Sequence, residues 1–451
     1  MTVHNVLNAS QLQAALASAV GGDKIIVAAG NYGSVSISNR NYASNVTIQA
    51  ATFSNPAHFD GLFVSNSKNL TFSGLDLGRT LGPAEPEYTQ LNWVSNSSNI
   101  KFSGVTIHGS RDNDPTNDGV GLQLTNVTNF NINNSKFTEL YRGVAMQKSA
   151  NVTIQSSDFT TIRSDGVVVA AVDGIVLDKN LFSDFRPIIP DHADAIQFWN
   201  TGQTKGSSNI TIKNNVLMQG GFSGVEGTGV QGIFISDPLQ YGFKNVLIQN
   251  NLMYSNGAYN GITVVGGAGV QILGNTVVSK TTDNKQFWIR LEDTDSINLQ
   301  GNLFDNFITK NVTKLFQANN TNLLLNPGAR AEIADLDNAH NSSDLHLANV
   351  GYQNPVSPPP SAISSAIGNS IGDMLGAQGG SSLSKTLDMS GLKSALLAAQ
   401  PVNDATSTVL PDAAELFAPA PIQHTPSHDF VPGAVLFASF VDPVNYFVAL
   451  P

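Results

Sequence analysis

Apolar and polar residues alternate in short runs from about residue 20 to residue 350, and one four-residue phrase recurs through them. The phrase opens with Asn, Gly or Ser, its second and fourth residues are apolar, and its third residue is polar in most copies. Successive copies lie 22 to 36 residues apart, with first residues Asn45, Asn69, Asn99, Asn129, Asn151, Gly174, Asn209, Asn245, Gly269 and Ser296. Alternation with a period of two residues predicts β-strands and excludes helical repeats.

A second strand precedes most copies of the phrase, and its second and fourth residues are apolar. Alternate residues of a strand point to opposite faces, so these positions are expected to face inward. Val167, Ile196 and Ile233 should therefore stack as one interior ladder. A base period of 22 to 24 residues with variable insertions is typical of a parallel β-solenoid of roughly ten coils, in which insertions become loops.

The first residues predict a cap for this solenoid. Residues 8–20 have the pattern of a short amphipathic helix with Asn8 or Ser10 as its N-cap, and an apolar strand follows from Lys24. The end of a solenoid is an open strand edge, which a helix at this position would cover.

The repeat and the opening segment NASQLQAALASAVGGDKIIVAAGNY resemble the right-handed parallel β-helix superfamily of pectate-lyase-like proteins, over about residues 5 to 350. That superfamily includes polysaccharide lyases and mannuronan C5-epimerases. The resemblance implies an all-β chain folded as a single-stranded right-handed parallel β-helix with an N-terminal helical cap. It does not choose a reaction, because the same superfamily includes glycosidases, phage tailspikes and binding proteins.

The composition changes after the repeat ends. The last 97 residues contain 12 of the 20 prolines. We therefore expect a catalytic β-helix domain over residues 1–355 and a low-complexity Pro/Ala/Ser-rich tail over 356–451. The tail is interpreted as disordered, with an uncleaved export signal or a binding or capping segment as alternatives, and its removal is expected to leave the β-helix folded.

Charge and composition exclude several partners. There are 34 acidic and 23 basic residues, with no basic run, so a nucleic-acid surface has no support. The absence of cysteine excludes disulfides and thiol catalysis. No apolar run reaches the roughly 18 residues of a membrane span, and residues 1–5 lack a signal core. These features suit a bacterial protein that is secreted or attached to the cell surface without an N-terminal signal.

The candidate chemistry is concentrated at the entrance to the strands that precede the phrase. Aligning the coils on their inward residues gives one column of polar residues: Arg142, Asp165, Asp194, Gln231 and Asn260. Arg163 and His192 lie in the column two residues earlier. Neighbouring coils are about 4.8 Å apart, so Asp165 is expected beside Asp194 and Arg163 beside His192.

These residue types fit chemistry on a uronic acid. Arg163, with Arg142 or Arg186, would neutralise the substrate carboxylate. His192 is the expected general base or acid. Asp191 and Asp194 would orient the imidazole, or would bind Ca²⁺ together with Asp165; both roles are open.

Outward-facing residues of the same strands are expected to form the floor of a sugar-binding groove: Gln197, Trp199, Phe234 and Arg290. The expected partner is an anionic polysaccharide and the expected reaction is β-elimination, with C5-epimerisation as the alternative. The run Asp191–Asp194 resembles the Asp-Pro-His-Glu motif of mannuronan epimerases, with a different order of residues. Glycoside hydrolysis ranks lower because the neighbouring arginines are expected to lower the carboxyl pKa values. A noncatalytic polysaccharide-binding β-helix is the remaining alternative.

Overall fold

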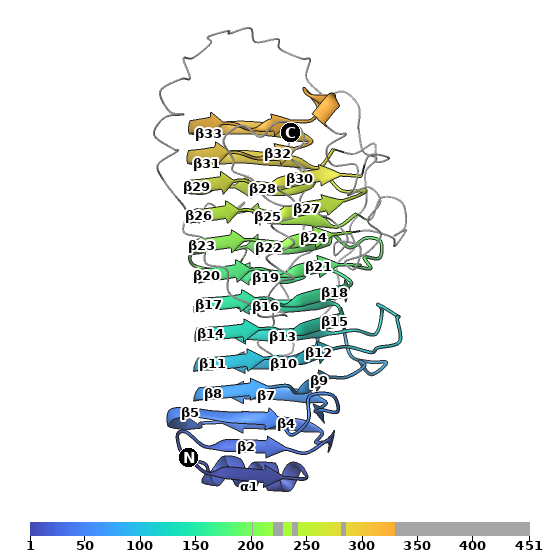
Figure 1. The fold of residues 1–451 in the computed structure, drawn as a ribbon, viewed down its shortest axis with the longest axis vertical. Helices are drawn as coiled ribbons and strands as arrows, with labels where there is room; N and C mark the ends of the chain where they lie inside the picture. Colours follow the sequence, from blue (N-terminus) through green and yellow to red (C-terminus); the bar gives the residue numbers. More distant parts are fainter. Residues whose placement is uncertain (201, 220–228, 237–241, 281–285, 330–451) are drawn as a thin grey trace, which may run out of the picture. The chain divides into compact units, whose positions relative to one another are not determined.

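The computed structural model describes residues 1–200, 202–219, 229–236, 242–280 and 286–329. All of these residues belong to the first of two units of the chain, residues 1–375. The tail predicted from residue 356 lies outside the described residues. In the first unit, parallel strands stack coil upon coil as a β-helix (Figure 1).

A typical coil contributes two consecutive strands to a sheet of 22 strands and a third to a sheet of 12, counted over the described residues. The first strands of the coils are β4 (Ser34–Ser38), β7 (Gly61–Ser65), β10 (Gln90–Ser95), β13 (Val120–Thr125), β16 (Arg142–Gln147), β19 (Val167–Ala170), β22 (Asp194–Trp199), β25 (Gln231–Ser236) and β28 (Asn260–Val265). The second strands, to which the N-terminal strand β1 (Val3–Val6) adds, are β2 (Lys24–Val27), β5 (Asn41–Ala50), β8 (Lys68–Ser73), β11 (Ser98–Ser103), β14 (Thr128–Asn133), β17 (Ala150–Gln155), β20 (Asp173–Asp178), β23 (Ser208–Lys213), β26 (Phe243–Gln249) and β29 (Gly267–Leu273).

The smaller sheet consists of short strands, and two long strands complete the larger sheet. The short strands are β3 (Gly30–Asn31), β6 (Ala57–Phe59), β9 (Asp76–Gly78), β12 (Thr106–His108), β15 (Lys136–Leu140), β18 (Asp158–Ile162), β21 (Leu181–Ser183), β24 (Val216–Met218), β27 (Leu252–Ser255), β30 (Thr276–Ser279), β32 (Leu303–Phe304) and β34 (Thr321–Asn322). The long strands β31 (Trp288–Gln300) and β33 (Asn306–Ala318) each run through the first and second strand positions of their coils.

The recurrent phrase marks the bend between the first and second strands. Its opening asparagines from Asn69 to Asn245 have φ between 54° and 62°, and Gly174, Gly269 and Ser296 also have positive φ. This left-handed conformation is tolerated by Gly and Asn more readily than by other residues. The side chains also join neighbouring coils, since Asn99 Nδ2 donates to Asn69 Oδ1 at 2.9 Å.

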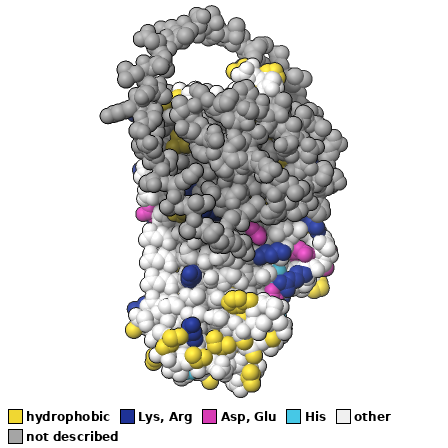
Figure 2. All heavy atoms as spheres, viewed as in Figure 1, with side chains coloured by type: hydrophobic (Ala, Val, Ile, Leu, Met, Phe, Trp, Pro, Cys, Tyr) yellow, Lys and Arg dark blue, Asp and Glu magenta, His cyan; other side chains and the backbone are white. Residues whose placement is uncertain are grey.

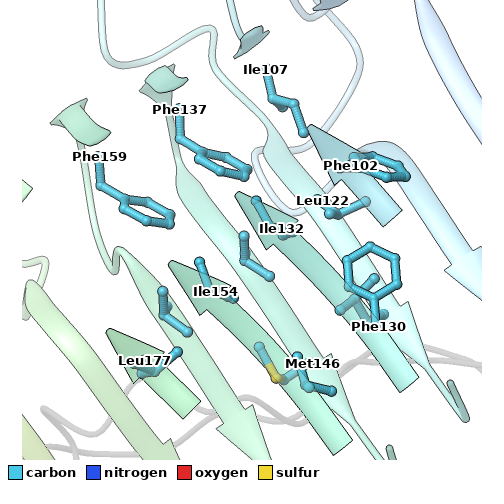
Figure 3. Packing of buried hydrophobic residues seen from close by; sticks show 14 of the residues in the cluster. Phe102, Ile107, Leu122, Phe130, Ile132, Phe137, Met146, Ile154, Phe159 and Leu177 are labelled. Atoms are coloured by element: carbon cyan, nitrogen blue, oxygen red, sulfur yellow. The ribbon is translucent and has the colours of Figure 1, made fainter. Parts of the chain in front are cut away.

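The predicted interior ladder is confirmed. Val167 pairs in register with Ile196, and Ile196 with Ile233, and all three side chains are fully buried. Beside this ladder the rings of Phe137 and Phe159 stack with centroids 4.6 Å apart (Figure 3). The core is therefore a continuous column in which each residue packs against its counterparts in the coils before and after it.

Glycine at the start of the first strands allows the coils to approach. A Cβ atom at Gly143 would lie 2.5 Å from the carbonyl oxygen of Gly166 and 2.7 Å from the ring of Phe159. Both distances are shorter than a carbon contact allows, so a side chain here would separate the coil from its neighbour.

The N-terminal cap is also confirmed. Helix α1 spans Ala9–Ser18, and the side chain of Asn8 accepts a hydrogen bond from the Gln11 backbone N–H as an N-cap. Leu12 and Leu16 are buried against the first coil. Helix α1 has ten residues, and among the described residues no helix has the length and apolar character needed to cross a membrane.

A ladder of asparagines runs beside the smaller sheet, buried from Asn180 to Asn302 and partly exposed at its last member; the members are Asn180, Asn215, Asn251, Asn275, Asn302 and Asn320. Each Oδ1 from Asn215 onward accepts two hydrogen bonds from the preceding asparagine, one from its backbone N–H and one from its Nδ2, at 2.9–3.0 Å. Burial of a polar group costs free energy unless the group is hydrogen-bonded. In this ladder each Oδ1 accepts the backbone and side-chain N–H groups of the preceding asparagine.

We expect Asn251→Ala to lower the free energy of unfolding by about 2–4 kcal/mol. The substitution leaves two buried donors of Asn215 without their acceptor, and each unsatisfied group costs about 1–3 kcal/mol. Asn131→Ala is the matched control, because Asn131 is a partly exposed outward residue of β14, and it should change stability by less than about 0.5 kcal/mol. Urea unfolding monitored by circular dichroism measures both, and equal losses would contradict the role of the ladder.

Candidate functional site

The residues of the predicted constellation come together where the chain enters strands β16, β22, β25 and β28 and the turn before β19. We call this group the polar cluster; its members are Tyr141, Arg142, Arg163, Asp165, Asp191, His192, Asp194, Gln231 and Asn260. Each is carried at or just before the first strand of its coil, so the stacking of the coils brings them together.

The predicted column of Arg142, Asp165 and Asp194 is present. Arg142 Nε donates to Asp165 Oδ2 at 2.8 Å, and the backbone N–H of Asp194 donates to Asp165 Oδ1 at 3.2 Å. The side chains of Asp165 and Asp194 are 1% and 0% exposed, so both carboxyl groups are removed from solvent.

Arg163 has different partners from those expected. Its Nε donates to Asp191 Oδ2 at 2.7 Å and one terminal nitrogen donates to Glu87 Oε2 at 2.6 Å. The side-chain partner of Arg163 is therefore Asp191, the residue before His192, and the predicted position beside His192 agrees with the register of the coils. Arg163 is already neutralised on two sides by protein carboxylates, so a role in positioning suits it better than direct binding of a substrate carboxylate.

Glu87 was missed by the sequence analysis. It lies in the insertion between β9 and β10 and reaches Arg163, which is 76 positions later in the chain. Insertions do not share the spacing of the repeat, so aligning the coils gives no signal for this contact.

One aromatic ring contacts both arginines of the polar cluster. The guanidinium carbons of Arg142 and Arg163 each lie 5.0 Å from the centre of the Tyr141 ring, within the range of a cation–π interaction. Burial raises the pKa of Tyr141 above its ordinary value. Tyr141 therefore holds the two cations at fixed places while remaining a neutral phenol.

His192 is the histidine of the polar cluster, and 16% of its side chain is exposed. Its Nδ1 lies 3.3 Å from Asp194 Oδ2, and its Nε2 contacts the side-chain amide of Gln231. The ring of Phe234 packs edge-on against the imidazole with centroids 5.8 Å apart. These three contacts fix the orientation of the ring.

A chain of hydrogen bonds also fixes the tautomer of His192. The indole Nε1 of Trp288 can only donate, and it donates to Asn260 Oδ1 at 2.9 Å. The Asn260 amide nitrogen consequently faces Gln231 Oε1, and the Gln231 nitrogen faces His192 Nε2. Nε2 is then the acceptor, so Nδ1 carries the proton and faces Asp194. Gln231 and Asn260 belong to the predicted column of polar residues, but their sequence positions indicated no role for them.

The protonation of Asp165 differs from the expectation for a carboxyl group beside an arginine. Burial raises the pKa of Asp165 to about 6; Arg142 opposes this shift and the charge of Asp194 adds to it. Desolvation outweighs the arginine because the side chain is fully enclosed. Arg142 thus lowers the pKa of Asp165 as expected, but the expected net lowering is wrong because burial has the larger effect.

Two of the three carboxylates predicted to bind Ca²⁺ are ion-paired with arginines of the polar cluster. Asp165 is paired with Arg142 and Asp191 with Arg163. Asp165, Asp191 and Asp194 are not among the groups of three acidic or histidine ligands that the described residues bring together within 4.8 Å. This arrangement gives no support to a calcium site built from them.

Three of the four predicted groove residues, Gln197, Phe234 and Arg290, share a ladder, but the four do not form an open floor. Gln197 pairs in register with Phe234 on the next coil, and Arg290 lies on the same ladder. Gln197, Trp199 and Phe234 are nevertheless buried. Gln197 donates to Asp194 Oδ2 at 2.9 Å and Phe234 packs on His192, so these two residues support the site rather than line a free surface.

The two remaining predicted substrate-binding arginines contact polar side chains outside the polar cluster. Arg186 donates to Asn113 Oδ1 at 2.9 Å in an insertion between β12 and β13. Arg290 is ion-paired with Glu292, three coils beyond Asp194 and therefore roughly 14 Å along the sheet. Arg290 is therefore placed to bind a neighbouring sugar residue rather than the one at His192, and the role of Arg186 stays a prediction.

The sequence of residues 92–277 matches the family described as right handed beta helix region. This segment is a right-handed β-helix. The matched region contains the entire polar cluster, so the site belongs to the repeat itself. No curated protein sequence matches the chain.

Solved structures with similar coils have diverse activities. A family 28 exopolygalacturonase of Yersinia enterocolitica is 13% identical over 71% of this chain and 78% of its own, with a TM-score of 0.44. The pectate lyase Pel9A is 14% identical over 80% and 87%, with a TM-score of 0.41. The surface adhesin PfbA of Streptococcus pneumoniae is 12% identical over 69% and 88%, with a TM-score of 0.42. Likenesses at this level do not select a reaction.

The raised pKa of Asp165 predicts a pH dependence of stability. The native state holds this proton up to about pH 6, whereas the ordinary pKa is 3.8. Between these values the native state binds more protons than the unfolded state, so the stabilising contribution is full at low pH and is lost as pH rises through about 6.

Asp165→Asn should therefore become more stable relative to the unsubstituted protein as the pH rises from about 4 to about 7. Urea unfolding at both pH values measures the difference, and Asp293→Asn, at an exposed bend, should leave it unchanged. A difference that does not depend on pH would contradict the assignment.

Proposed function

We propose that this protein is a carbohydrate-active enzyme that cleaves an anionic, uronic-acid-containing polysaccharide by β-elimination. The observation that carries the proposal is the His192–Asp194 pair. Within the polar cluster, the pair presents an imidazole that reaches solvent and has an unprotonated Nε2, with its Nδ1–H directed at a buried carboxylate.

This arrangement suits removal of the proton at C5 of a uronate. Nε2 takes the proton, the C5–H electrons form the C4–C5 double bond, and the bond from C4 to the linking oxygen breaks. The proton on His192 then passes to the departing oxygen. Asp194 favours the transient imidazolium by holding its Nδ1–H, as an orienting carboxylate does in other acid–base pairs. For the substrate to approach, the Gln231 amide must give up its contact with Nε2.

Arg142 is the cation best placed to stabilise the developing negative charge. Its side chain is 14% exposed against 8% for Arg163, and Asp165 and Tyr141 hold its guanidinium in place. A fixed cation near the substrate carboxylate lowers the cost of the carbanion without having to move during the reaction.

An aromatic pair further along the same sheet supports binding of a sugar chain. Tyr259 and Trp288 stack with centroids 4.9 Å apart and an angle of 19°, and Tyr259 is 45% exposed. Aromatic faces pack against the apolar faces of sugar rings. Trp288 also begins the hydrogen-bond chain to His192, so sugar binding there is coupled to the orientation of the base.

Glycoside hydrolysis is the second candidate, because Asp165 has the raised pKa that a general acid needs. It ranks second because that mechanism requires two carboxyl groups in contact with the sugar. The side chains of Asp165 and Asp194 are almost completely buried.

Incubation with alginate, pectate, glycosaminoglycans and a neutral glucan tests the reaction class. We expect one anionic polymer to yield unsaturated products, seen as a rise in ultraviolet absorbance. Constant absorbance with altered sugar ratios in proton NMR would indicate C5-epimerisation instead. New reducing ends without unsaturation, particularly from the neutral glucan, would favour hydrolysis and contradict the proposal.

His192→Ala should reduce turnover at least about a hundredfold, which is the typical contribution of a general acid–base group. The matched control is His4→Ala, because His4 also lies 3.3 Å from a carboxylate, Asp23, but in the first coil. Asp194→Asn should lower turnover and shift the pH profile, since Nδ1–H loses its anionic partner. Near-normal turnover of His192→Ala on the cleaved polymer would refute the assignment of the base.

A further inference from the structure

A second group of titratable side chains lies on the smaller sheet, near the N-terminal end of the β-helix. His58, Asp76 and His108 are on the successive strands β6, β9 and β12. We call these three residues the histidine–aspartate cluster. Figure 2 shows basic, acidic and histidine side chains on the flank from which the loops after β9 and β12 emerge in Figure 1. The function proposed above does not use this group.

The repeat itself creates this arrangement. His58 pairs in register with Asp76, and His108 lies two residues along β12 from the partner of Asp76, on the same face of the sheet. The two imidazole rings are stacked with centroids 5.6 Å apart. Three strands of regular structure therefore hold the side chains, which limits their freedom to separate.

The ligating atoms are at distances suited to a metal ion. His58 Nδ1 is 2.8 Å and His108 Nε2 is 3.4 Å from Asp76 Oδ2. All three ligand atoms lie within 4.8 Å of one another. Ligands bound tetrahedrally at about 2.0–2.1 Å are separated from one another by roughly 3.3 Å, so small adjustments would suffice.

The far nitrogen of each ring is held as a metal-bound histidine requires. His58 Nε2 lies 3.2 Å from the carboxylate of Asp60, and His108 Nδ1 lies 2.8 Å from the carbonyl oxygen of Gly109. A ring nitrogen next to a carbonyl carries the proton, so His108 Nε2 has the lone pair. Metal-binding histidines typically donate their other N–H to a carboxylate or a carbonyl in this way.

One atom of the histidine–aspartate cluster indicates that the cluster binds a ligand. His108 is 5% exposed, and its Nε2 is buried without a hydrogen-bond partner. A buried imidazole nitrogen without a partner is unfavourable, and a bound cation would satisfy it.

Arg111 is the feature that opposes metal binding. Its guanidinium donates to both carboxylate oxygens of Asp76, at 2.5 Å and 3.1 Å. The side chain is 45% exposed and belongs to the loop after β12, so it can move away from the carboxylate. A cation at Asp76 would repel it.

We propose that His58, Asp76 and His108 form a binding site for a divalent transition-metal ion of the zinc type. Two imidazole nitrogens and one carboxylate oxygen are the donor set that such ions prefer, whereas Ca²⁺ and Mg²⁺ prefer oxygen ligands. The bound ion would connect three successive coils next to the loop that carries Arg111. It would thereby stabilise the N-terminal half of the β-helix independently of the reaction at His192.

Titration of the metal-free full-length protein with Co²⁺ and then with Zn²⁺ tests the site. Co²⁺ bound by two imidazoles and a carboxylate gives visible absorption bands, which Zn²⁺ should abolish by displacement. Because the chain has eight histidines, the number of metal equivalents bound is compared between variants and the total number is not interpreted. His108→Asn and His58→Gln should each bind one equivalent fewer and lose these bands, and His4→Ala should match the unsubstituted protein.

His58→Gln keeps the experiment informative if His108→Asn fails to fold, because the His58 side chain is partly exposed. Arg111→Ala should bind the ion about tenfold more tightly or better, since it removes a competing cation from Asp76. Equal stoichiometry and equal spectra in the unsubstituted protein and His58→Gln would overturn the proposal. Weaker binding in Arg111→Ala would also overturn it, because the site would then depend on the arginine.

Discussion

The structure depends on hydrogen bonding between consecutive coils, because a single coil has no strand partner of its own. Parallel pairing in register joins every coil to the next through both sheets. The buried asparagine ladder adds a second series of coil-to-coil hydrogen bonds, in which each Oδ1 accepts from the backbone and the side chain of its neighbour. A solenoid of this kind gains stability from nearest-neighbour contacts. The helix α1 is needed because the first coil would otherwise present an unpaired edge.

Regular stacking also places the chemistry. A side chain at a given position of one coil lies about 4.8 Å from its counterpart in the next, so residues 18 to 37 positions apart become neighbours. Arg142, Asp165 and Asp194 are brought together in this way, and so are His58 and Asp76 on the other sheet. Residues from the insertions add ion pairs to the polar cluster and to the histidine–aspartate cluster: Glu87 pairs with Arg163, and Arg111 pairs with Asp76.

The pKa shifts in opposite directions at two buried carboxyl groups with histidine or arginine neighbours, Asp165 and Asp76. At Asp165 desolvation dominates and raises the pKa to about 6 despite Arg142. At Asp76 desolvation acts in the same direction, but His108, His58 and Arg111 outweigh it and hold the pKa well below its ordinary value. The number of hydrogen-bonding and charged partners decides which effect wins. One carboxyl can therefore retain a proton near neutral pH while the other remains an anion that attracts cations.

The sequence by itself determined the fold, the helical cap and the column of Arg142, Asp165 and Asp194, because each follows from a period that is visible along the chain. The positions with left-handed backbone conformation were also visible in the sequence as recurrent Asn or Gly, but the sequence did not show that a positive φ is the reason for them. Tertiary structure alone decided that Arg163 pairs with Glu87 and Asp191, that the tautomer of His192 is set from Trp288, and that burial outweighs Arg142 at Asp165. These features depend on insertions, side-chain directions and desolvation, which vary from coil to coil. The repeat pattern shows the strand positions that all coils have in common. The pairing and protonation of individual side chains depend on insertions and burial that differ between coils.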